Sequence, residues 1–211
     1  MGFARTNLRA VGVVPGMSGG AALAADFRTR IDAYRAARDF PAVKGPSYLS
    51  VHLRFGTVSI RELAAFAHAR SLEPDGEGAA TWLSELIWRD FYAQILSARP
   101  RTQVEDLRPR GDRWLDDPEA LAAWKEGMTG YPLVDAGMRQ LLREGWMHNR
   151  ARLVAASFLT RRLGVPWQRG ERHFSRLLID ADPANNAGNW QWAAGTGTDP
   201  RRTRTLNPVR Q

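Results

Sequence analysis

The chain has 211 residues, of which 44% are hydrophobic and 25% are charged, a composition typical of a globular protein that buries a sizeable core. It contains no cysteine, which excludes disulfide scaffolds, thiolate zinc sites and cysteine nucleophiles. The net charge is +8, and all 30 basic residues except Lys44 and Lys125 are arginines. This excess suits a nucleic-acid partner, but a basic, solvated surface explains it equally well.

The apolar runs are all short. The longest candidate, at 11–14, ends at Pro15, far below the roughly 18 residues that a membrane span needs. No segment combines a basic start, an apolar stretch and a cleavage site in the manner of a secretory signal. We therefore expect a cytoplasmic protein with no membrane contact.

Helical periodicity dominates the chain, and only residues 11–14 have the pattern of a strand. Residues 149–163 are apolar on most sides except at their arginine-rich start, which predicts a buried central helix. Gly, Pro and Asn clusters predict loops at 73–76, 99–111 and 180–197. The fold class predicted is all-α with long loops. The apolar positions with helical spacing are Leu23, Phe27, Ile31 and Tyr34; Leu83, Ile87, Phe91 and Ile95; and Val134, Met138, Leu141 and Leu142.

Two short motifs are rejected on context. Residues 16–20 read GMSGG and fit the G-x-S-x-G pattern of a hydrolase nucleophile elbow, but that elbow needs a sheet that this chain does not predict. We interpret the segment as a flexible turn in which Ser18 caps the next helix. The segment that begins at Asp180 starts like a calcium-binding loop. Asn185 and Gln191, however, stand at the sixth and twelfth positions, where that loop has glycine and glutamate. No metal site is expected.

Three groups of polar and aromatic residues stand out. Trp82, Glu85 and Trp88 share one helix face with Arg89. The simplest interpretation is an ordinary ion pair between the Glu85 carboxylate and the Arg89 guanidinium at a partly buried surface. A buried helix that begins near Asn149 must place its polar groups, Arg152 among them, against partners or a ligand. Residues 180–192 hold two acids, three asparagines and two indoles, which favours a recognition loop over a core segment.

Together these residues resemble the flavin-binding helical domain of the DNA photolyase/cryptochrome family. The resemblance covers residues 34–211. Its matching segments follow the family's order, and together they are highly specific. They are RDFP at 38–41, YLS at 48–50, WLSELIWR at 82–89, GYPLVDA at 130–136, GWMHNR at 145–150, GER at 170–172 and the run at 180–198.

The resemblance implies a multi-helix cup that holds FAD. Asn186 is implied to face N5 of the flavin, with arginines near the pyrophosphate and acids near the ribose and the flavin edge. Because the cofactor performs the electron chemistry, the protein supplies position and electrostatics. The cofactor-binding residues carried over are Tyr34, Ser47, Leu49, Ser50, Trp82, Arg89, Asn149, Arg152, Asp180, Ala181, Asp182 and Asn186.

The resemblance also implies a DNA partner that carries a pyrimidine dimer, met by Arg38, Glu85, Trp88, Asn149, Arg150 and Trp192. Glu85 would hydrogen-bond the flipped lesion. Trp190, Trp167 and Trp114 match the family's electron-transfer chain, whereas Trp124 and Trp146 are expected to be core residues. The implied activity is light-driven repair of cyclobutane pyrimidine dimers by a monomer.

Several departures from the family pattern bear on this reading. Asn149 and Leu153 replace the histidine pair of enzymes for six-four photoproducts, which favours cyclobutane dimers. Pro46 and Tyr48 stand where threonine and arginine are common. We expect residues 1–20 to be a linker-like segment and 21–211 a helical domain that lacks its last helices, with no antenna domain. A cryptochrome-like photoreceptor without repair activity, or an inactive fragment, is the alternative.

Overall fold

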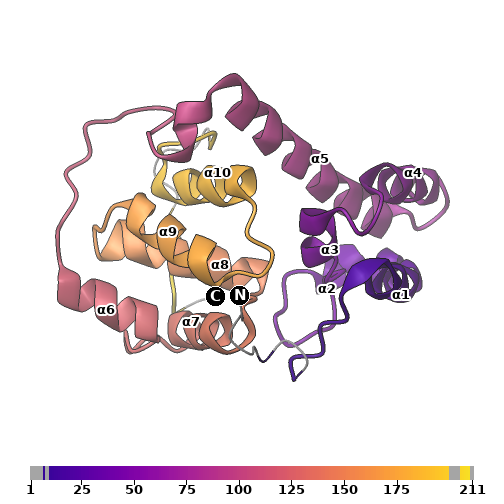
Figure 1. The fold of residues 1–211 in the computed structure, drawn as a ribbon, viewed down its shortest axis with the longest axis horizontal. Helices are drawn as coiled ribbons and strands as arrows, with labels where there is room; N and C mark the ends of the chain where they lie inside the picture. The colour runs from indigo at the N-terminus through magenta and orange to yellow at the C-terminus, as the bar shows by residue number, and fades with distance from the viewer. Residues whose placement is uncertain (1–6, 8–9, 200–204, 210–211) are drawn as a thin grey trace, which may run out of the picture. The chain divides into compact units, whose positions relative to one another are not determined.

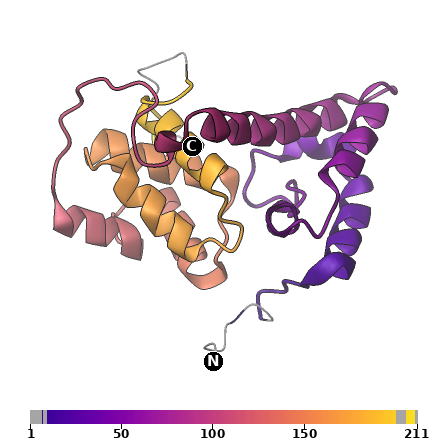
Figure 2. The same cartoon turned by 45° about the horizontal axis from the view of Figure 1, so that its top comes forward.

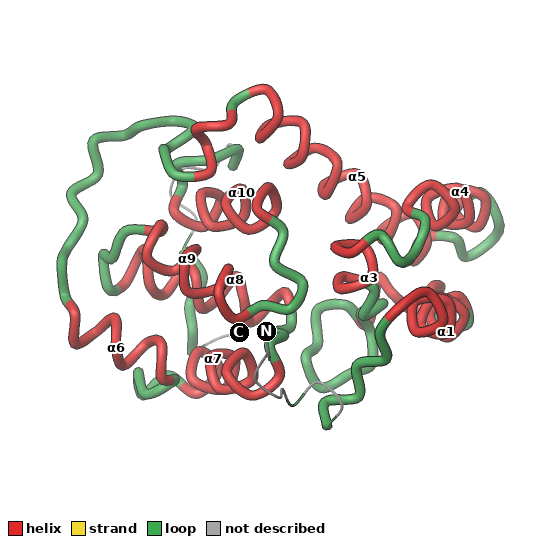
Figure 3. Tube along the Cα trace, viewed as in Figure 1, coloured by secondary structure: helices red, strands yellow, loops and turns green. Residues whose placement is uncertain are grey.

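The computed structural model describes residues 7, 10–199 and 205–209, and these form helices and loops without a strand (Figure 3). The predicted all-α class is confirmed. The chain divides into an N-terminal unit that ends at Ile87 and a C-terminal unit that begins at Trp88. No helix in the described part of the chain is both long and apolar enough to cross a membrane.

The core of the N-terminal unit is built around Phe27. Its ring lies 4.8 Å from that of Trp82 and 5.7 Å from that of Tyr34, and Ile31 and Leu49 are buried in the same cluster. The elements of this unit are α1 (Gly16–Arg28), η1 (Ile31–Ala33), α2 (Tyr34–Ala37), α3 (Ser50–Phe55), α4 (Ile60–Ser71) and the first part of α5 (Glu77–Ala98).

The start of the described chain differs from its prediction. Residues 11–14 form a turn and an extended lead into α1 rather than a strand. Ser18 lies inside α1 and Pro15 occupies the N-cap, so the predicted serine cap is wrong. A Cβ on Gly19 would lie 1.9 Å from the carbonyl oxygen of Val14, so this glycine lets the chain fold back closely on itself. The linker boundary at residue 20 stays a prediction.

The C-terminal unit stacks its helices around an aromatic core. Within it α8 and α9 lie between α10 and α7 (Figure 1), and Trp124, Trp167 and Phe174 are buried among them. Helix α5 runs into this unit without interruption (Figure 2). The remaining elements are η2 (Pro100–Gln103), α6 (Pro118–Glu126), α7 (Pro132–Glu144), α8 (Asn149–Ser157), the π-helical turn η3 (Phe158–Arg162), α9 (Trp167–Leu177) and α10 (Pro183–Ala194).

The predicted central helix is confirmed. Helix α8 continues directly into η3, so residues 149–162 are helical throughout, and Val154, Ala155 and Leu159 are buried. Its polar start is satisfied as the sequence requires, because His148 caps the helix and accepts a hydrogen bond from the backbone N–H of Arg150 at 3.1 Å.

The loop predicted at 180–197 is wrong over most of its length, because residues 183–194 form α10. The Asp182 side chain caps the helix by accepting from Asn185 N at 2.9 Å, Pro183 occupies the first turn, and Gly195 ends the helix with φ 75°. These are strong start and stop signals, and they outweigh the asparagine- and glycine-rich composition.

Helices α9 and α10 approach closely at a glycine. A Cβ on Gly170 of α9 would lie 2.2 Å from Cη2 of Trp190 and 2.6 Å from Leu159. The indole of Trp190 therefore rests on the helix backbone where any other residue would place a side chain. Trp167 precedes Gly170 by three residues and lies on the same face of α9.

We predict that Gly170→Ala destabilises the chain by about 1–3 kcal/mol, because the added methyl group has no room and the ring of Trp190 must shift. The measurement is the free energy of unfolding from urea titration. Gly137→Ala is the matched control, since that helical glycine has Ala151 Cβ as its nearest neighbour at 3.2 Å and alanine is intrinsically the better helix former. Equal stability of the two variants would contradict the packing described.

Candidate functional site

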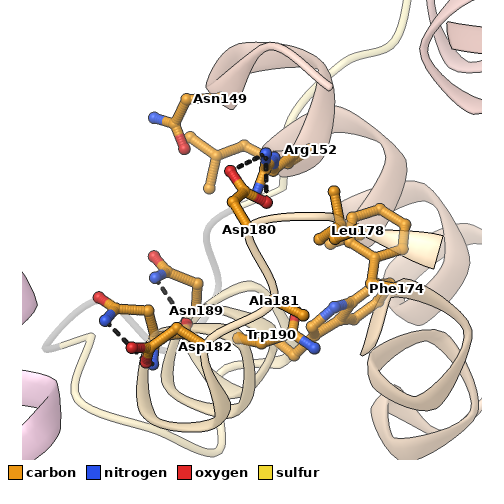
Figure 4. A pocket seen from close by; sticks show the side chains of 13 residues that line it. Asn149, Arg152, Phe174, Leu178, Asp180, Ala181, Asp182, Asn189 and Trp190 are labelled. Atoms are coloured by element: carbon orange, nitrogen blue, oxygen red, sulfur yellow. Dashed lines mark hydrogen bonds and ion pairs between the residues drawn. The ribbon is translucent and has the colours of Figure 1, made fainter. Parts of the chain in front are cut away.

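The C-terminal unit contains a pocket with a polar and an apolar side (Figure 4). Its cavity measures about 100 Å³, smaller than the roughly 300–1,000 Å³ of a complete small-molecule site, so it is suited to one portion of a large ligand. The lining residues come from α8, α9, α10 and the segment before α10. They are Asn149, Arg152, Leu153, Ala156, Phe174, Leu178, Asp180, Ala181, Asp182, Asn185, Asn186, Asn189 and Trp190.

A buried ion pair holds one side of this pocket. Nη2 of Arg152 lies 2.9 and 3.2 Å from the two carboxylate oxygens of Asp180, whose side chain is only 3% exposed (Figure 4). Nε of the same guanidinium donates to the carbonyl of Met147 at 2.8 Å. Such charge-assisted bonds are needed to keep a carboxylate ionised inside a protein. The pair thus presents fixed charges to whatever occupies the pocket.

A second polar part of the pocket is formed by the start of α10. Asp182 accepts from the backbone N–H of Asn185 at 2.9 Å and from its side-chain amide at 3.0 Å. Arg89 of α5 forms an ion pair with Asp182 at 3.9 Å. Asn189 donates back to the carbonyl of Asn185 at 2.8 Å. No three metal-ligating side chains are grouped among the described residues.

The amide of Asn186 is oriented by α9. Its Nδ2 donates to the carbonyl and the carboxylate of Glu171, at 3.1 and 2.9 Å, and to Oγ of Ser175 at 2.9 Å. The amide nitrogen is thus fully engaged. Glu171 belongs to the GER segment at 170–172, one of those that carry the family resemblance, so the sequence could have indicated it. Ser175 lies in no such segment.

Aromatic residues form the apolar side. Phe174, Leu178 and Trp190 line the pocket together (Figure 4). The Trp190 ring lies 5.0 Å from that of Phe174 and 5.9 Å from that of Trp124, both edge to face. Trp124 is fully buried, as predicted for a core residue, whereas Trp146 is only partly buried. The pocket wall is therefore continuous with the aromatic core.

The three indoles of the predicted electron-transfer chain occupy graded depths. Trp190 and Trp167 are buried, while Trp114 is partly buried against the same core. Trp167 and Trp190 lie on α9 and α10, the helices that meet at Gly170. Nε1 of Trp167 donates to the carboxylate of Asp106 at 2.7 Å, a partner that the sequence did not indicate.

The other predicted cofactor residues lie in the N-terminal unit. Tyr34, Leu49 and Trp82 are buried in its core, and Ser47 and Ser50 flank the start of α3. Arg30 holds the loop before them by donating to the carbonyl oxygens of residues 44 and 46, at 2.6 and 3.2 Å. Ser50 Oγ is buried without a hydrogen-bond partner among the described residues.

The predicted DNA-binding residues are divided between the units. In the N-terminal unit Arg38 Nη1 donates to Glu85 at 2.6 Å and lies over the ring of Tyr34. Burial opposes the charge on Arg38, but the hydrogen bond to Glu85 and nearby acidic groups prevail and raise its pKa. In the C-terminal unit Trp88 is 47% exposed, Asn149 is exposed, and Arg150 and Trp192 are partly buried.

The family model described as the FAD-binding domain of DNA photolyase matches residues 82–211, more than half of the chain. The chain belongs to this photolyase family. It is 55% identical over 178 residues to the deoxyribodipyrimidine photo-lyase of Streptomyces griseus, covering 84% of this chain and 38% of that protein. The Escherichia coli enzyme of the same name is 46% identical over 183 residues, with coverage of 84% and 39%.

Solved structures of the photolyase family have the same fold. A class III photolyase from Agrobacterium tumefaciens superposes with a TM-score of 0.90 at 38% identity, covering 96% of this chain and 42% of that one. A cryptochrome from Synechocystis gives 0.88 at 32% identity, with coverage of 97% and 44%. This photolyase-family chain thus spans about two fifths of the length of the relatives it matches.

A histidine beside the aromatic core adds a pH dependence. Burial, aided by the charges of Lys125 and Arg176, lowers the pKa of His173 from 6.5 to about 4, and its ring lies 5.6 Å from that of Trp124. The folded chain therefore binds fewer protons than the unfolded chain between about pH 4 and 6.5. The resulting stability is fully present above pH 6.5 and declines as the pH falls toward 4.

We predict that His173→Gln reduces the loss of unfolding free energy between pH 7 and pH 4.5, measured by urea titration at several pH values. Titrating carboxylates affect both proteins and cancel in the comparison. His68→Gln replaces an exposed histidine and is the control. A wild-type pH profile in the His173 variant would show that this ring has no such effect.

Proposed function

We propose that this chain binds FAD and uses it for light-driven splitting of cyclobutane pyrimidine dimers in DNA. The observation that carries the proposal is the pocket of the C-terminal unit, which joins the Arg152–Asp180 pair and oriented amides on one side to the ring of Trp190 on the other. Its relatives of 41–55% identity are named deoxyribodipyrimidine photo-lyases, which supports the same activity here.

The donor set fits a flavin. An isoalloxazine ring has an edge of alternating hydrogen-bond donors and acceptors and a flat apolar face, and the pocket offers groups for both. Asp180, Asp182 and the amide oxygen of Asn186 would serve as acceptors, and Arg152 and Asn149 as donors. The unpartnered Ser50 Oγ of the N-terminal unit suits a phosphate oxygen. The full proposed set remains Tyr34, Ser47, Leu49, Ser50, Trp82, Arg89, Asn149, Arg152, Asp180, Ala181, Asp182 and Asn186.

When bound, FAD supplies light-driven one-electron donation to the dimer, whose cyclobutane ring then opens. The residues of the chain hold the reactants and set the electrostatics. The amide of Asn186, oriented by Glu171 and Ser175, gives the flavin a fixed polar neighbour. Trp190, Trp167 and Trp114 are proposed to pass electrons inward, so that the cofactor is kept in its reduced state.

The chain is also proposed to bind the damaged strand. Trp88 and Trp192 are partly exposed indoles suited to stacking on a dimer that is flipped from the duplex. Asn149 and Arg150 begin α8 at the surface, where they can reach phosphate or base edges. Glu85, oriented by Arg38, offers a carboxylate for hydrogen bonds to the lesion.

A light sensor without repair activity is the second candidate, because a cryptochrome is among the similar solved structures. The test loads the purified chain with FAD, reduces it, and illuminates it with an oligonucleotide that contains one thymine dimer. We expect light-dependent loss of the dimer, measured by chromatography. FAD binding without dimer loss would favour the sensor, and failure to bind FAD would contradict the proposal as a whole.

We predict that Arg152→Ala raises the dissociation constant for FAD at least about tenfold. The variant loses charged hydrogen bonds, each worth about 1.5–3 kcal/mol, and leaves the buried carboxylate of Asp180 unpaired. The measurement is titration of flavin fluorescence, with circular dichroism to check folding. Should the alanine variant unfold, Arg152→Lys keeps the charge without the fork and is expected to weaken binding as well.

The control is Arg143→Ala, which removes an exposed guanidinium of α7 whose ion-pair partner is the adjacent Glu144. Its affinity for FAD is expected to match that of the unaltered chain. Unchanged affinity in a folded Arg152 variant would remove this arginine from the cofactor site.

We predict that Trp192→Ala weakens binding to dimer-containing DNA more than binding to undamaged DNA, by about 1–3 kcal/mol, the usual value for one stacked base. Fluorescence anisotropy with paired oligonucleotides measures the difference. Trp146→Ala, which removes another partly buried indole, should leave the preference for damage unchanged. Equal losses on both DNAs for Trp192→Ala would indicate general DNA contact without lesion recognition.

A further inference from the structure

Two buried indoles of the aromatic core have different hydrogen-bond acceptors. Trp124 and Trp167 are both 0% exposed. Nε1 of Trp124 donates to the neutral carbonyl oxygen of Ala155 at 3.1 Å, whereas Nε1 of Trp167 donates to the carboxylate of Asp106 at 2.7 Å. A backbone carbonyl satisfies an indole N–H, so packing alone does not require a charged acceptor at Trp167.

The position of Asp106 is fixed from both sides. Nε2 of Gln191 donates to the carbonyl oxygens of Thr102 and Glu105, at 2.6 and 3.2 Å, and its Oε1 accepts from the backbone N–H of Leu107 at 2.8 Å. Gln191 is itself buried and follows Trp190 directly on α10. The carboxylate that meets Trp167 is therefore held in place by the residue next to Trp190.

We propose that Asp106 is a positioning residue for electron transfer that acts through Trp167. Its negative charge, fixed on the indole N–H, stabilises the positive charge that Trp167 carries after losing an electron. An anion beside a site acts more strongly in a protein interior than in water. Oxidation of Trp167 thus becomes easier than oxidation of indoles that have neutral partners. This inference rests on the proposed function, which supplies the reason for the electron to move.

The electron balance of the step is simple. One electron moves from Trp167 to an oxidised Trp190, which returns to its neutral form while Trp167 becomes a radical cation. No covalent bond forms or breaks, and the Nε1 proton of Trp167 stays in its hydrogen bond to Asp106. The oxidant that starts the sequence is a photoexcited flavin. With Asp106 ionised, the reverse transfer from Trp190 to Trp167 is disfavoured.

The first test uses the full chain without cofactor and reads the hydrogen bond directly. In an NMR spectrum of chain labelled with ¹⁵N in its indoles, Trp167→Phe identifies the Nε1–H signal of Trp167. Asp106→Asn replaces a charged acceptor with a neutral one, so this signal should move upfield while the other indole signals stay in place. A signal that does not move would overturn the proposal.

The second test measures oxidation, again without cofactor. Azide radicals generated by pulse radiolysis oxidise the indoles by one electron, and the share of radical on Trp167 is the part lost in Trp167→Phe. We expect Asp106→Asn to lower the equilibrium population of the Trp167 radical about tenfold relative to the other indoles. Tenfold corresponds to about 59 mV for one electron. Asp106→Glu should restore most of that population.

Asp116→Asn is the matched control, because its exposed carboxylate pairs with Arg169 and lies in the same loop. It should leave both the NMR signal of Trp167 and its radical population unchanged. A shifted NMR signal with an unaltered radical population in Asp106→Asn would make Asp106 a structural partner only and overturn the proposal. Because neither test uses flavin or DNA, failure of FAD binding or repair is detected separately.

Discussion

The ring of Trp190 lies against the backbone of Gly170, and this contact determines how closely α9 and α10 approach. A glycine is required there because a Cβ would fall 2.2 Å from the indole. The close approach makes Trp190 both a wall of the pocket and a part of the buried core. It also brings the Asn186 amide on α10 within hydrogen-bond distance of Glu171 and Ser175 on α9. The apolar wall and the oriented amide of Asn186 thus depend on one packing contact.

Charge burial is the second constraint on the site. The Asp180 carboxylate is almost wholly buried, and an ionised carboxylate is retained in such a place only when it is paired and hydrogen-bonded. Arg152 supplies that partner and is itself held by the carbonyl of Met147. Apolar residues of similar size would often stabilise the fold as well, so stability alone does not explain this ion pair.

The sequence predicts the helical class and the central helix well, because both depend on local periodicity. The patterns at 16–20 and in α10 mislead for one reason: glycine and short polar residues usually favour loops, whereas here they serve close packing and capping. In α10 the capping signals Asp182, Pro183 and Gly195 indicate a helix whereas the composition indicates a loop, and the capping signals decide the structure. The pairs Arg152–Asp180 and Trp167–Asp106 join residues 28 and 61 positions apart, and no pattern in one sequence reports such contacts.

The hydrogen bonds of Gln191 have a consequence for the order in which the chain opens. They connect α10 to residues that lie 84 to 89 positions earlier, so closing this long loop requires both parts to be folded. Residues 104–117 hold no regular helix, yet their start is tied to the interior by the side chain of Gln191 and by that of Trp167, which donates to Asp106. The backbone N–H of Leu107 lies in an irregular segment but is bonded to α10 through Gln191. Its hydrogen-exchange rate should therefore be as low as the rates of the backbone N–H groups of α10. In this region slow hydrogen exchange would mark a side-chain tether, not secondary structure.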